Sequence, residues 1–175
     1  MEAQMTNVEL QERLRAVEAQ LEIMQVIASY GPAVDAGEAE QVADLFADDA
    51  RYSYSMGSGE TTLSGREGLI DMVHGPMHQE IITGGAGHVM GQPRIVVEGE
   101  RAVATCHSML VRYESSIGRW YVYRLAANRW EFAKTAAGWR VAHRVNRLLD
   151  GRLDARVLLG EAPSLDLSGS DQSAC

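Results

Sequence analysis

The hydrophobic pattern of this 175-residue chain changes from a helical period to a period of two near residue 88, and this change constrains the fold more than any other feature. Apolar residues first recur at three- and four-residue spacing, which predicts amphipathic helices. The predicted helices span 7–30, 33–46 and 65–74. The pattern then alternates with period two, which predicts strands. The predicted strands lie near 88–97, 101–114, 119–134 and 138–149.

Helices followed by a run of strands are typical of an α+β fold, in which N-terminal helices pack on one face of a strongly curved, mixed or antiparallel sheet. Such a sheet and its helices form a cone with one open end, and a pocket inside the cone is the expected binding site. Short polar connections between the strands, such as Glu98-Gly99-Glu100, fit hairpin turns.

Several local signals predict where the helices begin and end. Gly31-Pro32 is expected to kink or end the first helix, because proline cannot donate to the helical ladder. The polar run 47–50 is expected to end the second helix in a turn, before a short strand at 51–56. Ser64 is expected to cap the third helix, with Glu67 completing a capping box.

Two glycine-rich segments predict mobility. Gly57-Ser58-Gly59 reads as a flexible run, and the glycines of 81–87 predict a mobile loop. The segment after Gly160 has few large apolar residues, which predicts disorder from about 161. We therefore expect a helical extension over 1–14, one domain over 15–150 and a C-terminal extension over 151–175.

Charge and composition exclude several classes of function. The chain has 16 basic and 24 acidic residues, and this balance disfavours binding to nucleic acid, which needs clustered basic side chains. No apolar run approaches the roughly 18 residues that span a bilayer, and the start does not resemble a secretory signal. We expect a cytoplasmic protein without membrane association, in which Cys106 and Cys175 are free thiols.

Four polar residues in otherwise apolar surroundings are candidates for chemistry: Tyr30, Asp35, His88 and Arg144. Asp35 either caps a helix or orients a histidine. His88 opens the first long strand, where it is either a structural residue or a general base that titrates near neutral pH. Tyr30 either donates a hydrogen bond to substrate or packs in the core with its hydroxyl satisfied.

Arg144 lies in a strand whose alternation is expected to place Arg140, Ala142, Arg144 and Asn146 on one face, opposite Val141, His143 and Val145. That face is either solvated or turned into the pocket, where Arg144 would stabilise an oxyanion or a leaving group. Further candidates for contact with a substrate are Tyr52, Tyr54, His107, Tyr113 and Tyr121. His107 is expected either in the pocket wall or in the core.

The sequence predicts no metal and no organic cofactor. His74 and His78 are four residues apart, but Gly75-Pro76 separates them and no third ligand has a fitting spacing. Glycine-rich nucleotide-binding motifs and a nucleophile elbow are also missing from the sequence.

Four segments, in this order and spacing, resemble the SnoaL-like branch of the nuclear-transport-factor-2 superfamily over about residues 15–150. They are YGPAVDAGEAEQVADLFADDARY, SGREGLIDMV, GHVMGQPRIVVEGERAVA and WEFAKTAAGWRVAHRVNR. This resemblance implies the cone-shaped α+β fold, and relatives include scytalone dehydratase, hexachlorocyclohexane dehydrochlorinase, bile-acid 7α-dehydratase and the small subunits of ring-hydroxylating dioxygenases.

The resemblance also implies roles for particular residues. The catalytic aspartate of the family falls on Asp35, its histidine base on His88, the tyrosine of the dehydratases on Tyr30 and the pocket arginine of the dehydrochlorinase on Arg144. Tyr52 matches a substrate-contacting aromatic residue. The second histidine of scytalone dehydratase has no counterpart, because Tyr113 stands in its place with His107 six residues earlier.

We therefore expect a cofactor-independent lyase, similar to a dehydratase, that acts on a small hydrophobic cyclic, aromatic or steroid-like molecule. The alternatives are an isomerase of the ketosteroid type, a carbon–carbon lyase that releases formaldehyde from an aryl propanediol, and a non-enzymatic subunit of a dioxygenase or ligand-binding protein. Apolar positions on the open sheet face, and the resemblance, predict a homodimer or a homotrimer.

Overall fold

A computed structural model describes residues 6–56 and 59–160. Five helices lie among them: α1 (Asn7–Asp35), α2 (Ala39–Asp44), α3 (Gly65–His74), α4 (Pro76–Thr83) and α5 (Leu153–Gly160). The strands are β1 (Phe46–Met56), β2 (Gly59–Ser64), β3 (Ala86–Met90), β4 (Arg94–Glu98), β5 (Arg101–Glu114), β6 (Arg119–Thr135) and β7 (Gly138–Leu148). The long strands β5, β6 and β7 follow α1 to α4 as the sequence predicts, while β1 and β2 stand between α2 and α3.

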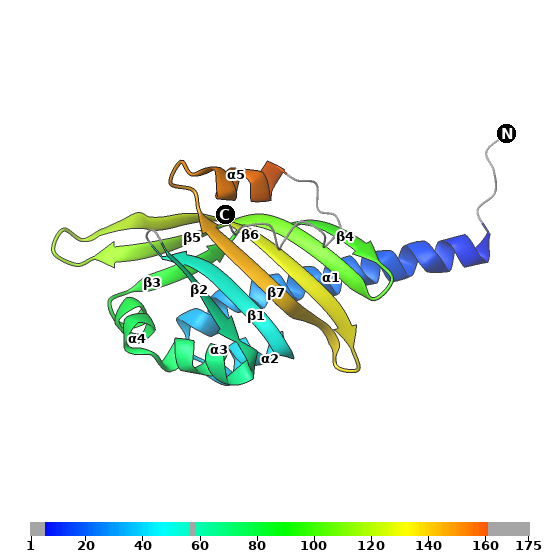
Figure 1. Cartoon of the computed structure of the whole chain (residues 1–175), viewed down its shortest axis with the longest axis horizontal. Coiled ribbons are helices and arrows are strands. Elements are labelled where there is room, and N and C mark those ends of the chain that lie inside the picture. The colour runs from blue at the N-terminus through cyan, green and yellow to red at the C-terminus, as the bar shows by residue number, and fades with distance from the viewer. Residues whose placement is uncertain (1–5, 57–58, 161–175) are drawn as a thin grey trace.

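The strands form one mixed sheet in the order β2-β1-β7-β6-β5-β3, with β4 also paired to β5. The β1–β7 pair is parallel and the other pairs are antiparallel. In Figure 1, α1 crosses behind the strands while α5 lies at the upper edge of the view. The core fills the space between the helices and the inner face of the sheet, around Ile23, Ile27, Trp130 and Val141. The fold is the mixed α+β arrangement expected from the sequence.

The first helix does not end at Gly31-Pro32, because α1 continues to Asp35. Pro32 lies on the exposed side of the helix, where water can hydrate the carbonyl group that loses its partner. The helix ends at a turn in which Gly37 has a φ of +73°, a conformation that glycine adopts without strain. At its other end a capping box joins Thr6 and Glu9.

The polar run 47–50 forms part of β1 instead of the expected turn. Phe46, at the start of β1, pairs with Val141 of β7, so a long-range partner supplies the hydrogen bonds that extend the strand upstream of the expected 51–56. Sequence pattern alone describes only local preference, and here tertiary pairing overrides it.

Around the third helix, the expected bounds 65–74 match α3, but the Ser64 side chain makes no capping hydrogen bond. Residues 59–64 form β2, which the sequence did not predict, while 57–58 lie outside the described residues. Most of the loop expected over 81–87 is occupied by the end of α4 and the start of β3. The predicted strand 88–97 is two strands, β3 and β4, that both pair with β5.

The C-terminal region contains one element that the sequence did not predict, because α5 follows β7 and contacts β5, β6 and β7. The disorder expected from about 161 concerns residues 161–175, which lie outside the described residues, as does Cys175. Cys106 is a buried free thiol in β5, and burial raises its pKa. None of the helices in the described part of the chain is both long and apolar enough to cross a membrane.

Candidate functional site

A cavity of about 760 Å³ lies between the helices and the inner face of the sheet. Its apolar wall includes Leu63, Met72, Ile81, Met90, Leu110 and Leu148. Its polar and aromatic wall includes Tyr30, Tyr52, Tyr54, His78, His88, Ser108, Arg124, Arg144 and Asn146. An apolar chamber with few polar groups is the usual form of a site for a small organic ligand.

Asp35 and His88 form a close pair at this cavity. The Nδ1 atom of His88 lies 2.6 Å from Oδ1 of Asp35, and the backbone N–H of His88 donates to Oδ2 at 2.7 Å. A carboxylate can only accept, so His88 carries a proton on Nδ1, and in the neutral ring Nε2 holds the lone pair. Both oxygens of Asp35 are thus engaged by one residue, which fixes the tautomer and the position of the imidazole.

The close approach of α1 to β3 brings these two residues together. A Cβ on Gly31 would stand only 2.3 Å from the His88 carbonyl oxygen, so the helix can approach the strand this closely only with glycine at this position. Gly31, read from the sequence as part of a helix break, permits this approach. Asp35 follows one turn later, at the end of α1.

Arg144 is turned inward by a bulge in β7. Glu131 pairs with His143 while Phe132 pairs with Val141, which leaves Ala142 as an extra residue. Val141 and Arg144 are consequently both buried, although strict alternation from the sequence placed them on opposite faces. A solvated face for Arg144 is wrong, since only 2% of this residue is exposed.

Three aromatic rings surround the Arg144 guanidinium. Its Cζ atom lies 4.1 Å from the ring centres of Tyr30 and Trp130 and 4.6 Å from that of Tyr52. Such contacts stabilise a desolvated cation through the negative faces of the rings. The structure shows no carboxylate paired with Arg144 among the described residues, and its Nη1 has no hydrogen-bond partner there.

The amide of Asn128 is the main hydrogen-bond partner of Arg144. Its oxygen accepts from Nε at 3.1 Å and from Nη2 at 2.9 Å, and also from Nδ2 of Asn146 at 3.0 Å. Its own Nδ2 donates to the Ser108 hydroxyl at 2.7 Å. Because Asn128 is neutral, this buried network fixes the guanidinium without cancelling its charge.

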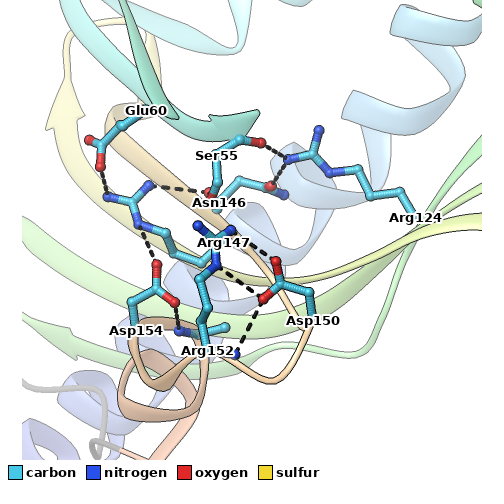
Figure 2. A network of polar contacts seen from close by, with 9 residues as sticks. Ser55, Glu60, Arg124, Asn146, Arg147, Asp150, Arg152 and Asp154 are labelled. Atoms are coloured by element: carbon cyan, nitrogen blue, oxygen red, sulfur yellow. Dashed lines mark hydrogen bonds and ion pairs between the residues drawn. The ribbon is translucent and has the colours of Figure 1, made fainter. Parts of the chain in front are cut away.

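The same network continues through Asn146 to Arg124, and Figure 2 shows this part of it. Nη2 of Arg124 donates to the carbonyl of Ser55 and to Oδ1 of Asn146, both at 2.8 Å. The neighbouring Arg147 donates to Glu60 of β2 at 2.6 Å. These contacts join β1, β2, β6 and β7 beside the polar wall of the cavity.

Tyr30 lies in the wall of the cavity beside Arg144. This residue of α1 is only 3% exposed, and its ring lies against the Arg144 guanidinium. Burial raises the pKa of its phenol well above the ordinary value and the neighbouring Tyr52 raises it further, although Arg144 opposes this shift. The hydroxyl therefore stays protonated near neutral pH and is a hydrogen-bond donor.

His78 also lines the cavity, although the sequence analysis considered it only as a candidate metal ligand. Its Nε2 lies 2.8 Å from the Val34 carbonyl oxygen, so Nε2 carries a proton, and its ring centre is 5.9 Å from that of His88. Burial lowers its pKa. Within 6–56 and 59–160, no three His, Cys, Asp or Glu side chains gather closely enough to hold a metal ion.

Six of the residues singled out from the sequence meet at the cavity. Tyr30, Tyr52, Tyr54, His88 and Arg144 line it, and Asp35 joins them through its hydrogen bond with His88. Three others do not reach it. His107 is exposed on β5, and Tyr113 and Tyr121 are exposed on the β5–β6 hairpin. The expectation of His107 in the pocket wall or core is wrong. The sequence did not point to His78, Ser108 or Asn128 as residues of this site. Strand register places Ser108 and Asn128, while His78 lies in α4 and is held at the Val34 carbonyl of α1.

Comparison with known proteins places the chain in a family. The model of the SnoaL-like domain matches residues 15–145. A solved NTF2-like protein with a cystatin-like fold from Novosphingobium aromaticivorans is 38% identical, with a TM-score of 0.84, and the match covers 90% of this chain and 99% of that one. Among curated proteins, none matches this chain.

More distant solved structures share the fold. Rv3472, a protein of unknown function from Mycobacterium tuberculosis, is 18% identical with a TM-score of 0.67, covering 90% of this chain and 91% of its own. The beta subunit of a candidate aromatic-ring-hydroxylating dioxygenase from N. aromaticivorans is 21% identical with a TM-score of 0.61, and the match covers 76% of this chain and 90% of that one. The resemblance drawn from the sequence is confirmed, and the chain belongs to the SnoaL-like family of NTF2-like proteins.

Proposed function

We propose that this protein is a cofactor-independent lyase that eliminates water from a small, largely hydrophobic cyclic or aromatic substrate. The observation that carries the proposal is the pair of Asp35 and His88 at the cavity, with Nδ1 of the histidine held by the carboxylate. This arrangement supports general base catalysis, because the carboxylate fixes the imidazole and stabilises the cation formed when Nε2 accepts a proton.

The proposed reaction needs only groups of the chain. Nε2 of His88 removes a proton from a carbon next to an activating carbonyl group, and the electrons of the broken C–H bond form the new double bond. The C–O bond of the neighbouring hydroxyl group breaks, and the departing oxygen takes a proton from the His88 imidazolium to leave as water. The Tyr30 hydroxyl donates to the substrate oxygen that gains negative charge, while the Arg144 charge beneath it supports that donation.

The wall of the cavity supports a hydrophobic substrate of modest size. Aliphatic and methionine side chains make up much of the wall, and Tyr52 and Tyr54 add a tilted pair with ring centres 5.1 Å apart. The volume of about 760 Å³ falls within the ordinary range for sites that hold small organic molecules. A bicyclic or steroid-like compound bearing a hydroxyl group β to a carbonyl satisfies both requirements.

The test is a screen of β-hydroxy carbonyl compounds of this kind, with product mass measured for the wild type, Asp35→Asn and His88→Gln. We expect loss of water from at least one compound, with kcat reduced at least about 100-fold in both variants. The matched control is His107→Gln, which changes an exposed histidine outside the cavity and keeps the wild-type rate.

The product identifies the reaction class. A product of unchanged mass, made with the same dependence on His88, would instead identify an isomerase, and release of formaldehyde would identify carbon–carbon cleavage. Binding without turnover by the wild-type chain contradicts an enzymatic role. Full activity of Asp35→Asn and His88→Gln contradicts the pair as the proton-transferring unit.

A further inference from the structure

The first two thirds of α1 carry an apolar stripe that covers nothing in the described structure. Five side chains at alternating spacings of four and three residues form it: Leu10, Leu14, Val17, Leu21 and Met24. They are between 39% and 57% exposed. Isolated exposed leucines are common on proteins, but this run also has the alternating spacing that lines the seam of a coiled coil.

The stripe lies on the side of α1 opposite its own sheet. Ala19, Ile23 and Ile27 are the buried residues in this part of the helix, and at 100° per residue they lie across the axis from Leu21. Figure 1 shows the first turns of α1 extending past the edge of the sheet. One face of the helix thus completes the core of this chain, while the other presents a second, separate apolar surface.

We propose that this stripe pairs with the same stripe of a second copy of the chain, as a short parallel two-stranded coiled coil. In the heptad abcdefg, Leu14 and Leu21 then occupy position a, and Leu10, Val17 and Met24 occupy position d. Both sheets lie on the outer sides of the helix pair, so each cone stays clear of the other along the seam. The inference is independent of the proposed function.

The flanking charges favour a second copy in parallel orientation. Arg13 falls at a g position and Glu18 at the following e position, and in a parallel pair the g side chain of one helix faces this e side chain of its partner. Two-fold symmetry makes this complementary contact twice. An antiparallel pair sets g against g and e against e, where Arg13 meets only Arg13 or Gln20 and Glu18 meets no basic residue.

A competing surface exists on the β5–β6 hairpin, where Ile117, Trp120 and Val122 are exposed. The two surfaces differ in how far their residue pattern selects a particular partner. The hairpin patch has no repeat that selects a partner, whereas the α1 stripe has the regular spacing and the self-complementary charges that a copy of the same helix satisfies. The experiment therefore includes a variant in each.

The test measures the mass of the full chain by sedimentation equilibrium over a range of concentrations. We expect a dimer for the wild type and at least a 100-fold higher dissociation constant for the double variant Leu14→Glu, Leu21→Glu. Ala16→Glu, which adds a charge to the same helix off the seam, and Trp120→Glu, in the hairpin, should keep the wild-type mass. All these side chains are exposed, and circular dichroism checks that each variant is folded.

A cysteine cross-link tests the partner and its orientation. On a background of Cys106→Ser and Cys175→Ser, Leu14→Cys should form a disulfide-linked dimer on mild oxidation, whereas Glu12→Cys, at the outward f position, should not. A wild-type monomer at all concentrations, a double variant of unchanged mass, or loss of association only in Trp120→Glu overturns the proposal. Cross-linking at Glu12→Cys but not at Leu14→Cys overturns it as well.

Discussion

The backbone of Gly31 in α1 lies against the backbone of His88 in β3, at a distance that leaves no room for a side chain. A Cβ on Gly31 would stand 2.3 Å from the His88 carbonyl oxygen, well inside van der Waals contact. The next turn of the same helix carries Asp35, whose carboxylate holds the His88 ring and its backbone N–H. One small residue therefore controls the geometry of the proposed catalytic pair.

Gly31→Ala should move β3 away from α1 and weaken the pair of Asp35 and His88. We expect the free energy of unfolding to fall by about 1–3 kcal/mol, the usual cost of overpacking, and turnover to fall with it. Urea denaturation measures the first effect and the rate of water loss measures the second.

The matched control for that substitution is Gly68→Ala, in the interior of α3. There a Cβ would meet its nearest neighbour, the Cβ of Leu63, at an ordinary 3.6 Å. Alanine should stabilise this helix by about 0.5–1 kcal/mol. Equal stability of the Gly31→Ala variant and the wild type would show that the backbone of β3 adjusts at no cost.

Tyr30→Phe should lower kcat by about 100-fold, because removal of one donor to a developing oxyanion has an effect of this size. KM should change little, since the ring and its contacts with Trp130 and Arg144 remain. Steady-state kinetics separates the two constants. Tyr113→Phe, which removes a hydroxyl outside the cavity, is the control, and an equal effect of both substitutions contradicts the role of Tyr30.

Asn128→Leu should destabilise the fold by about 3–5 kcal/mol, because it leaves the buried Arg144 charge without the oxygen that accepts two of its hydrogen bonds. Chemical denaturation measures the change. Asn128→Asp keeps an acceptor and adds a countercharge, so it should cost less. If the free energy of unfolding of the leucine variant falls by less than about 1 kcal/mol, the rings of Tyr30, Tyr52 and Trp130 alone stabilise the guanidinium.

Stability should fall as the pH is lowered through the range just below the ordinary histidine pKa of 6.5. Burial lowers the pKa of both His78 and His143, so at these pH values the unfolded chain binds protons that the folded chain does not. The stabilisation is complete above about pH 6.5 and decreases below it, by at most about 1.4 kcal/mol per pH unit for each histidine.

Thermal unfolding of the wild type and His78→Gln at about pH 8 and about pH 5.5 checks this expectation. Glutamine can still donate to the Val34 carbonyl but does not titrate, so the variant should lose less stability on acidification. The same loss in both proteins would exclude His78 as a contributor.

The sequence by itself determined the class of fold, because a change from helical to strand periodicity is a local property that survives folding. The pairing of Asp35 with His88 could also be predicted from the sequence, because the resemblance to the family connects these two residues, which are 53 positions apart. Periodicity alone offers no such connection, and the roles of both residues stay proposals.

Only the tertiary structure decided the remaining features of the site. The extra residue at Ala142 shifts the alternation of β7 and buries Arg144, and a bulge leaves no mark in a sequence pattern. Asn128 looks like any polar residue in a strand until strand register places it under the guanidinium. Likewise, Gly31-Pro32 has the composition of a helix end, but α1 continues through it and packs against β3. In each case contacts between distant segments outweigh the local preference, which is all that a short stretch of sequence encodes.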